Sequence, residues 1–362
     1  MRKILLIIIA SFLFTSCNQN TWMKTDSGII VRINDKTGHG ARFIKVEPVS
    51  QKIIHVIASP AKRPSPDKSL CVIASPRPGL KYNVTISGDT LILSTLTLKA
   101  EVSLNTGQII FKDICDRILL AEPAVGGKSF TPLMVEGTAG YTMRQVFDSP
   151  DDEAFYGLGQ HQSEEFNWKG RNESLYQYNT KVSVPFVISN RNYGILWDNY
   201  SLTRFGDPRD YSQIDLFKLY DKHGEEGALT ASYYNNSDTN KLFIEREEAS
   251  VDYEDNTTVK NFPKGFQLYN SEIVWSGKIE PKESGLYHFR LYYAGYTKLY
   301  INNELVVPER WRTAWNPTPY KFERNLEKGR KYSVRIEWHP DGGVSYLGLK
   351  ALSPLPPAEQ NQ

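Results

Sequence analysis

Cysteine is scarce in this sequence, which holds three cysteines among 362 residues. Beyond Cys17, only Cys71 and Cys115 are available. In an oxidising compartment these two thiols form a disulfide if the fold brings them within bonding distance, and otherwise they are two buried thiols in separate strands. The spacing leaves both alternatives open. Neither cysteine has the histidine partner of a catalytic thiol, so cysteine chemistry is not expected to carry the function.

An excess of either charge is also absent, because 43 Lys and Arg stand against 41 Asp and Glu, for a net charge of +2. Without a basic stripe, nucleic acid is not an expected partner. A phosphate-binding glycine loop is missing too, since no helical pattern follows the glycine pair at 157–159. We predict no metal and no other cofactor, because the histidines lack the spacing of metal ligands; they are His39, His55, His161, His223, His288 and His339.

Long apolar runs are confined to the N-terminus. Two positive charges in Met1–Lys3 precede an apolar stretch over residues 4–14. This stretch is about half as long as the ~20 residues of a bilayer span, so it indicates a secretory signal rather than a membrane helix. The small residues before Cys17 resemble the lipobox of bacterial lipoproteins. We predict a lipoprotein signal over 1–17, lipidation of Cys17 and a periplasmic protein anchored to the membrane by its lipid; a plain signal peptide cut nearby is the alternative.

Aromatic residues and strand-like alternation are what the sequence has in quantity. Aromatic side chains make up 12% of the chain, with 21 Tyr, 16 Phe and 7 Trp. Tyrosine suits sugar faces, although β-sandwich cores and edges also collect it. Apolar and polar residues alternate with a period of two over 95–104, and a turn at 105–107 leads into a second strand at 109–111, which predicts a hairpin.

Similar alternation predicts strands at 28–34, 42–47, 53–58, 70–74, 82–86 and 186–196. Since no helical stripe occurs, we predict an all-β chain whose first domain, residues 18–223, is an antiparallel β-sandwich. A second, smaller sandwich is predicted over 227–353, because aromatic residues alternate with polar ones at 287–293 and 332–338. The proline-rich tail at 354–362 is interpreted as a linker.

Three segments of the first domain resemble the N-terminal domain of glycoside hydrolase family 31, the retaining α-glucosidases and α-xylosidases. They are Phe155–His161, Tyr178–Phe186 and Tyr193–Asn199. Many family members have glutamate where this chain has Gln160. The resemblance implies a galactose-mutarotase-like sandwich and a catalytic (β/α)8 barrel that is missing from the sequence, with the linker leading to it. Both catalytic carboxylates of the family lie on that barrel, so no catalytic residue is assigned and the chain is predicted to be inactive alone.

The second domain resembles the protective-antigen-type β-sandwich found in glycosidases, adhesins and toxins. Its matching segments are Trp275–Gly277, Ser284–Phe289, Leu299–Asn303 and Tyr332–Glu337. Adhesin relatives hold calcium with two adjacent aspartates, but this chain has Ala294-Gly295-Tyr296-Thr297 there. Calcium prefers six or more oxygen ligands, so a calcium-dependent lectin mode is not expected.

The resemblance implies that the loop over 159–170 forms a wall of the sugar pocket of the barrel. Its candidate contacts are Gln160, His161, Phe166, Asn167 and Trp168; alternatively the aromatic members fill one end of the sandwich. The adjacent Glu164 and Glu165 are interpreted as a solvated surface. In the second domain, Trp311 and Trp315 are predicted to be exposed indoles that bind a branched oligosaccharide; alternatively one belongs to the core and the other to a contact between domains.

The two resemblances together imply the front portion of an exo-acting α-glycosidase, with an α-xylosidase on xyloglucan oligosaccharides as the expected enzyme. The domains would shape its pocket and extend its binding of the oligosaccharide. The alternative is a non-catalytic glycan-binding lipoprotein that binds polysaccharide without any barrel.

Overall fold

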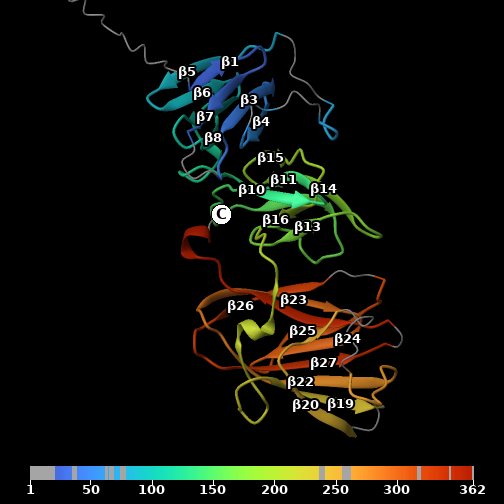
Figure 1. Ribbon diagram of the computed structural model, residues 1–362. Coiled ribbons are helices and arrows are strands. Elements are labelled where there is room, and N and C mark those ends of the chain that lie inside the picture. Colours follow the sequence, from blue (N-terminus) through green and yellow to red (C-terminus); the bar gives the residue numbers. More distant parts are fainter. Residues whose placement is uncertain are drawn as a thin grey trace, which may run out of the picture. The chain divides into compact units, whose positions relative to one another are not determined.

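The computed structural model describes residues 21–34, 39–61, 64, 69–73, 79–235, 241–254, 262–315, 319–341 and 344–360 (Figure 1). The predicted signal and Cys17 lie outside these residues. The regular structure of the described part is β-strand, apart from 3-10 turns at Ile214–Leu216 (η1) and Pro357–Glu359 (η3). A helix able to span a bilayer is not found in that part. Its strands pair antiparallel, which confirms the predicted all-β fold class.

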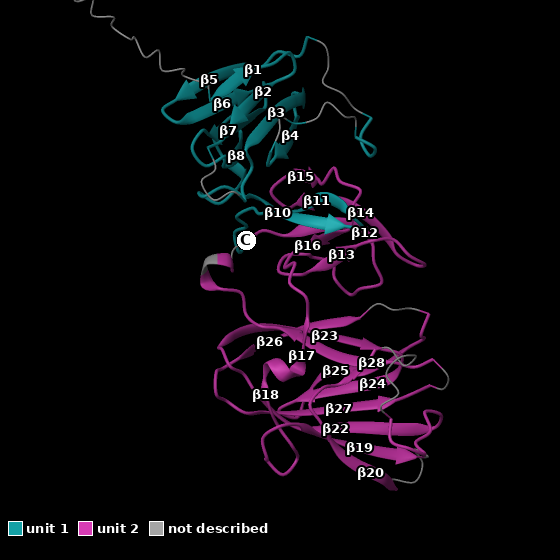
Figure 2. Ribbon diagram, viewed as in Figure 1, with its two compact units in different colours: residues 1–151, 362 teal, residues 152–361 magenta. Residues whose placement is uncertain are grey.

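Two compact units make up the chain: residues 1–151 with residue 362, and residues 152–361 (Figure 2). The first unit has a four-stranded sheet in the order β1-β2-β3-β4, a five-stranded sheet in the order β5-β6-β7-β8-β9, and the hairpin β10-β11. Its strands are β1 (Trp22–Lys24), β2 (Ile29–Arg32), β3 (Phe43–Ser50), β4 (Ile53–Ser59), β5 (Asn83–Ser87), β6 (Thr90–Ser94), β7 (Leu98–Ser103), β8 (Ile109–Asp113), β9 (Ile118–Ala121), β10 (Lys128–Val135) and β11 (Thr138–Gln145).

One hydrophobic core joins the two larger sheets of this unit. Ile29 and Val31 of β2 and Ile44 of β3 are fully buried together with Leu91 of β6 and Val102 of β7. These residues alternate with exposed or partly exposed neighbours along each strand, as expected for a sheet with one buried face. The first unit therefore contains an antiparallel sandwich.

The second unit begins with two small sheets, β12-β14-β15 and β13-β16. Leu158, Trp168, Leu175 and Val187 form their core. The strands are β12 (Phe155–Gln160), β13 (Glu173–Leu175), β14 (Val182–Ser189), β15 (Tyr193–Leu196) and β16 (Thr203–Phe205).

The rest of the second unit is a larger sandwich. One sheet has the order β17-β28-β23-β26, with β21 also paired to β28; the other has the order β20-β19-β22-β27-β24-β25, with β18 also paired to β22. The strands are β17 (Ser212–Gln213), β18 (Lys218–Tyr220), β19 (Leu229–Asn235), β20 (Leu242–Glu248), β21 (Asp252–Tyr253), β22 (Ser271–Glu280), β23 (Gly285–Tyr293), β24 (Gly295–Ile301), β25 (Glu304–Arg312), β26 (Tyr320–Leu326), β27 (Tyr332–His339) and β28 (Leu347–Leu352).

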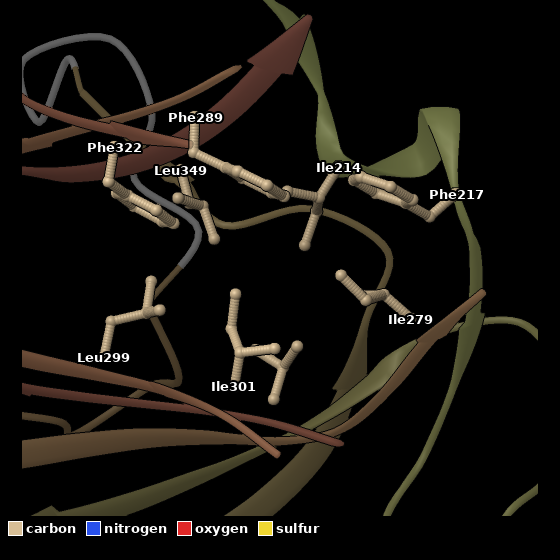
Figure 3. A pocket seen from close by; sticks show the side chains of 9 residues that line it. Ile214, Phe217, Ile279, Phe289, Leu299, Ile301, Phe322 and Leu349 are labelled. Carbon is tan, nitrogen blue, oxygen red and sulfur yellow. The ribbon is translucent and has the colours of Figure 1, made fainter. Parts of the chain in front are cut away.

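The alternation at 287–293 and 332–338 is confirmed by burial. The odd-numbered residues of β23 from Tyr287 to Tyr293 and the even-numbered residues of β27 from Tyr332 to Trp338 point into the core between the sheets. A cavity of about 10 Å³ remains there, lined by apolar side chains such as Ile214, Phe289 and Leu299 (Figure 3). A cavity of this size and polarity holds neither a ligand nor a stably bound water, so it is a packing defect rather than a site.

The segment 212–220, which the predicted boundary placed in the first domain, packs with this second sandwich. β17 pairs with β28, and β18 pairs with β22. Ile214, Phe217 and Leu219 are buried in the core, with the Phe217 ring stacked on Phe289 at a centroid distance of 5.9 Å. Burial of these apolar side chains explains why the segment joins the second sandwich.

Two predicted strands differ from the structure. The described part of the predicted strand at 70–74 is a loop, because the Ser69 hydroxyl accepts hydrogen bonds from the N–H groups of Cys71 and Val72 and so forms a turn. The predicted strand at 186–196 is a hairpin, since Asn192 adopts a positive φ of 66° between β14 and β15.

The cysteines also differ from both alternatives. Cys71 and Cys115 are free and exposed. They are therefore neither a disulfide nor a pair of buried thiols.

Candidate functional site

The loop over 161–172 leaves the sheet at an irregular point of β12. The pairing of β12 with β14 shifts register between Gly157 and Gly159. Gly159 has a φ of 97°, and a Cβ there would lie 2.1 Å from the carbonyl oxygen of Val182. Only glycine fits this close approach of two backbones, so the bulge fixes where the loop begins.

Trp168 and His161 anchor this loop to the sheet through buried contacts. Trp168 is 4% exposed, and its indole N–H donates to the carbonyl oxygen of Gly157 at 3.2 Å. The His161 ring lies edge-on to Trp168 at 5.4 Å, with Nε2 2.7 Å from the Leu158 carbonyl oxygen. Stacking on a sugar requires an open ring face, and Trp168 has none in this structure. The expected stacking role of Trp168 is therefore corrected to that of a core residue.

Burial lowers the pKa of His161, although the Leu158 carbonyl and the Glu173 carboxylate act in the opposite direction. The ring is therefore neutral at pH 7, with its proton on Nε2 for donation to Leu158. Nδ1 is buried without a hydrogen-bond partner and lies 4.0 Å from a Glu173 carboxylate oxygen. His161 thus orders the loop from within rather than reaching out to a ligand.

The other candidates on this loop lie at its surface. Phe166 is 82% exposed and rests against the ring of Tyr156 at 5.2 Å. Gln160 is exposed at the end of β12. The side-chain oxygen of Asn167 accepts hydrogen bonds from the N–H groups of Phe155 and Lys169, each at 3.0 Å. Gln160 and Phe166 are therefore available to a ligand, whereas the Asn167 oxygen is already used to shape the loop.

A buried ionic group, here called the Glu173 cluster, lies at the end of the loop and comprises Glu173, Lys181, Lys321, Arg171 and Glu323. Glu173 receives hydrogen bonds from Lys181 at 2.7 Å and from Lys321 at 3.0 Å, and its side chain is 11% exposed. Arg171 pairs with Glu323 of β26. Since Lys321 and Glu323 belong to the second sandwich, the cluster ties the loop to that sandwich.

The two lysines of this cluster control the ionisation of Glu173. Burial raises the pKa of Glu173, but attraction to Lys321 and the hydrogen bond and charge of Lys181 outweigh it, so the net pKa lies below the ordinary value. The carboxylate is therefore ionised at neutral pH and is the shared anionic partner of two largely buried ammonium groups.

A second ion pair joins the loop to the aromatic segment of β25. Glu164 pairs with Arg310, whose guanidinium lies over the Tyr320 ring at 4.6 Å. The neighbouring Glu165 is largely buried and pairs with Arg171 at 3.1 Å, and burial raises its pKa despite that partner. The interpretation of the pair as a solvated surface is therefore wrong for Glu165, whereas Glu164 remains exposed to solvent beside its arginine partner.

Both tryptophans predicted on the second sandwich are exposed. Trp311 lies in β25, is 52% exposed and donates its indole N–H to Asp341 at 2.9 Å. Trp315 lies in the turn after β25 and is 81% exposed. The Glu164–Arg310 pair places the loop beside this part of β25. Because adjacent side chains of a strand point to opposite faces, the Trp311 ring lies on the other face of β25 from Arg310.

Among the described residues, no group of three His, Cys, Asp or Glu side chains is placed to hold a metal ion. The exposed groups of the site are instead aromatic rings, an amide and ion-paired side chains, which suit the apolar faces and hydroxyl groups of a carbohydrate.

Comparison with known proteins identifies both parts of the chain. Residues 43–205 match the glycosyl hydrolase 31 N-terminal galactose mutarotase-like domain, and residues 224–350 match the PA14 domain. The chain therefore carries the N-terminal domain of glycoside hydrolase family 31 together with a PA14 domain, as the sequence motifs predicted.

The relatives of the chain include α-xylosidases and a family 31 glucosidase. An α-xylosidase of Saccharolobus solfataricus is 30% identical over 173 residues, which are 44% of this chain and 22% of that protein. A family 31 glucosidase of Pseudescherichia vulneris, itself uncharacterised, is 34% identical over 87 residues, which are 24% of this chain and 16% of that protein. The crystal structure of an α-xylosidase from Xanthomonas citri matches 93% of this chain with a TM-score of 0.85 and 37% identity, and the match covers 36% of that enzyme. The chain thus spans a minor part of the length of each relative.

Proposed function

We propose that this chain is the non-catalytic front portion of an exo-acting retaining α-glycosidase, an α-xylosidase that acts on xyloglucan oligosaccharides. The loop over 159–170 contributes a wall of the substrate pocket, and Trp311 and Trp315 bind the part of the oligosaccharide that extends beyond it. The Glu164–Arg310 pair carries this proposal, because it brings these two sequence-distant segments together. The α-xylosidase activity is inferred from the similarity of the chain to two α-xylosidases.

The proposal includes a catalytic barrel as the partner of this chain. Retaining glycosidases need two carboxylates about 5 Å apart. The glutamates of the site, Glu164, Glu165 and Glu173, are each engaged by lysine or arginine. The lysines beside Glu173 lower its pKa and hold it ionised, which makes it a poor general acid, whereas burial raises the pKa of Glu165 despite its arginine partner. None of the three glutamates is a free carboxylate. The described site therefore suits binding rather than bond cleavage.

Lipidation of Cys17 and periplasmic attachment remain part of the proposal on the basis of the leader sequence.

The 362-residue chain is expected to give no hydrolysis of p-nitrophenyl α-xyloside or α-glucoside above the blank. The coding sequence downstream of Gln362 is expected to continue into alternating strands and helices. Turnover by the purified chain would contradict the non-catalytic role. A stop codon at that point, combined with tight binding of xyloglucan fragments by the chain alone, would favour a glycan-binding lipoprotein instead.

Trp315→Ala, made in the enzyme that includes the barrel, should lower kcat/KM on xyloglucan oligosaccharides by about tenfold, which corresponds to about 1.4 kcal/mol. The reason is the loss of an exposed ring that stacks on a sugar. Activity on p-nitrophenyl α-xyloside should not change, because that substrate is too short to reach the tryptophan. Phe243→Ala is the matched control, since Phe243 is an exposed aromatic residue of β20 at the opposite edge of the same sheet. Equal losses on both substrates would contradict the proposed role.

A further inference from the structure

A polar groove lies on the second sandwich, away from the core. It has a volume of about 230 Å³ and is lined by residues of β22, β24 and β27, the turn after β24 and the loop after β18. Pockets for drug-sized ligands measure about 300–1,000 Å³, so this groove suits a single sugar ring rather than a long oligosaccharide.

Strand register explains which side chains line the groove. Arg335 of β27 lies opposite Ser276 of β22 on one side and opposite Tyr300 of β24 on the other. Ser333 lies opposite Lys278 in the same way. Because the alternate residues of β27, such as Val334, are buried in the core, these side chains point outward. One aromatic ring, two hydroxyl groups and two cations therefore share one surface.

Several charged side chains around the groove already form hydrogen bonds or ion pairs within the chain. The Asp221 carboxylate accepts hydrogen bonds from the N–H groups of residues 223, 224 and 225, and so it forms the turn that makes one wall. Lys222 pairs with Glu245 at 2.5 Å. The Nε of Arg335 donates to Glu337 at 2.7 Å.

Two cationic groups remain for a ligand. Glu337 accepts its hydrogen bond from Nε of Arg335, which leaves the terminal nitrogens of the guanidinium group for a ligand. Lys278 is exposed, and its ammonium group forms no ion pair with the residues that the structure describes. A planar guanidinium group together with a nearby ammonium group is suited to one carboxylate.

We propose that this groove binds a uronic acid residue, a pyranose that carries one carboxylate. The Tyr300 ring stacks on the sugar, Lys278 and Arg335 bind the carboxylate, and Ser276, Ser333 and Asn303 bind hydroxyl groups. A neutral sugar would satisfy the ring and the hydroxyl partners but would leave the Lys278 ammonium group without an anionic partner. This site is separate from Trp311 and Trp315 and does not rest on the proposed function.

The test is titration of the full chain, followed by NMR, with an oligosaccharide ending in glucuronic acid, its counterpart ending in glucose, and inorganic phosphate. The acidic sugar should bind with a dissociation constant of roughly 1 mM, and the neutral sugar at least about fivefold more weakly. Lys278→Ala should weaken the acidic sugar by about fivefold and leave the neutral sugar unchanged. Raising the salt concentration should reduce the difference between the two sugars.

Lys328→Ala is the matched control, because Lys328 is an exposed lysine outside the groove. Lys278→Arg should retain most of the affinity, which separates loss of charge from loss of fold. Equal binding of the two sugars, or an unchanged affinity of Lys278→Ala for the acidic sugar, would overturn the proposal. Binding of phosphate as tightly as the acidic sugar would overturn the sugar class and leave a simple anion site.

Discussion

Glu173→Gln is expected to lower the free energy of unfolding of the second unit by about 3 kcal/mol, the lower end of the range for breaking a buried ion pair. The carboxylate lies between the ammonium groups of Lys181 and Lys321, and all three side chains are largely buried. Glutamine keeps the shape of the side chain but removes the charge. Two buried cations then remain without a counterion, which is the costly outcome. Urea denaturation measured by circular dichroism gives this difference.

The matched control is Glu304→Gln, which removes the partner of Arg324 at an exposed position of the same unit. Exposed ion pairs contribute about 0–1 kcal/mol, so this variant should stay close to the parent protein. Lys321→Met in the Glu173→Gln background should recover part of the loss, because one unpaired cation is removed. A loss from Glu173→Gln no larger than that of the control would show that the Glu173 cluster does not stabilise the unit.

The same carboxylate predicts a pH dependence. Its pKa is lowered in the folded chain, so the folded state binds fewer protons than the unfolded state in the acidic range. The stabilisation is therefore fully present above the ordinary glutamate value of about 4.3 and is lost as the pH falls through the lower folded-state pKa. Glu173→Gln should flatten this part of the stability profile between neutral and acid pH.

Trp338→Ala is expected to destabilise the second unit by about 4 kcal/mol, within the range for removing a buried aromatic side chain. The indole is fully buried, stacks on Trp275 at a centroid distance of 6.4 Å, and donates its N–H to the Ala294 carbonyl oxygen at 2.8 Å. Alanine leaves a cavity and an unpaired carbonyl group at the centre of the core. Calorimetry or urea denaturation measures the loss.

Trp315→Ala provides the same chemical change at a surface position, and its effect on stability should be within about 0.5 kcal/mol of zero. Trp338→Phe keeps an aromatic ring in the core and should lose less than Trp338→Ala. If Trp338→Ala and Trp315→Ala had equal stability, the core assigned to the second sandwich would be wrong.

Patterns within a single strand were sufficient to predict much of this fold. Tyr287, Phe289 and Trp338 follow a period of two, and each is buried where the pattern requires it. Local turn chemistry is harder to read, which explains the errors at 70–74 and 186–196. A serine hydroxyl ended the first of these expected strands, and an asparagine with positive φ divided the second.

The candidate site was less predictable because its key contacts join distant residues. Lys321 and Glu173 are separated by 148 positions, and Arg310 and Glu164 by 146. Each of these residues is, in sequence, one charged side chain among many, and no spacing marks them as partners. Trp168 shows the opposite problem: an aromatic residue in a polar loop suggests a binding surface, yet the carbonyl group of Gly157 satisfies its indole and allows burial.

The contribution of residues 212–220 to the second sandwich determines how that sandwich can be excised. A fragment cut at the limits of the domain match, 224–350, would lack β17 and β18 and would leave the surface that Ile214, Phe217 and Leu219 cover open to water. Such a fragment would be prone to aggregate through this newly exposed apolar surface. Transplanting the sandwich into another enzyme should therefore start at or before Ser212 and retain the strand that ends at Leu352.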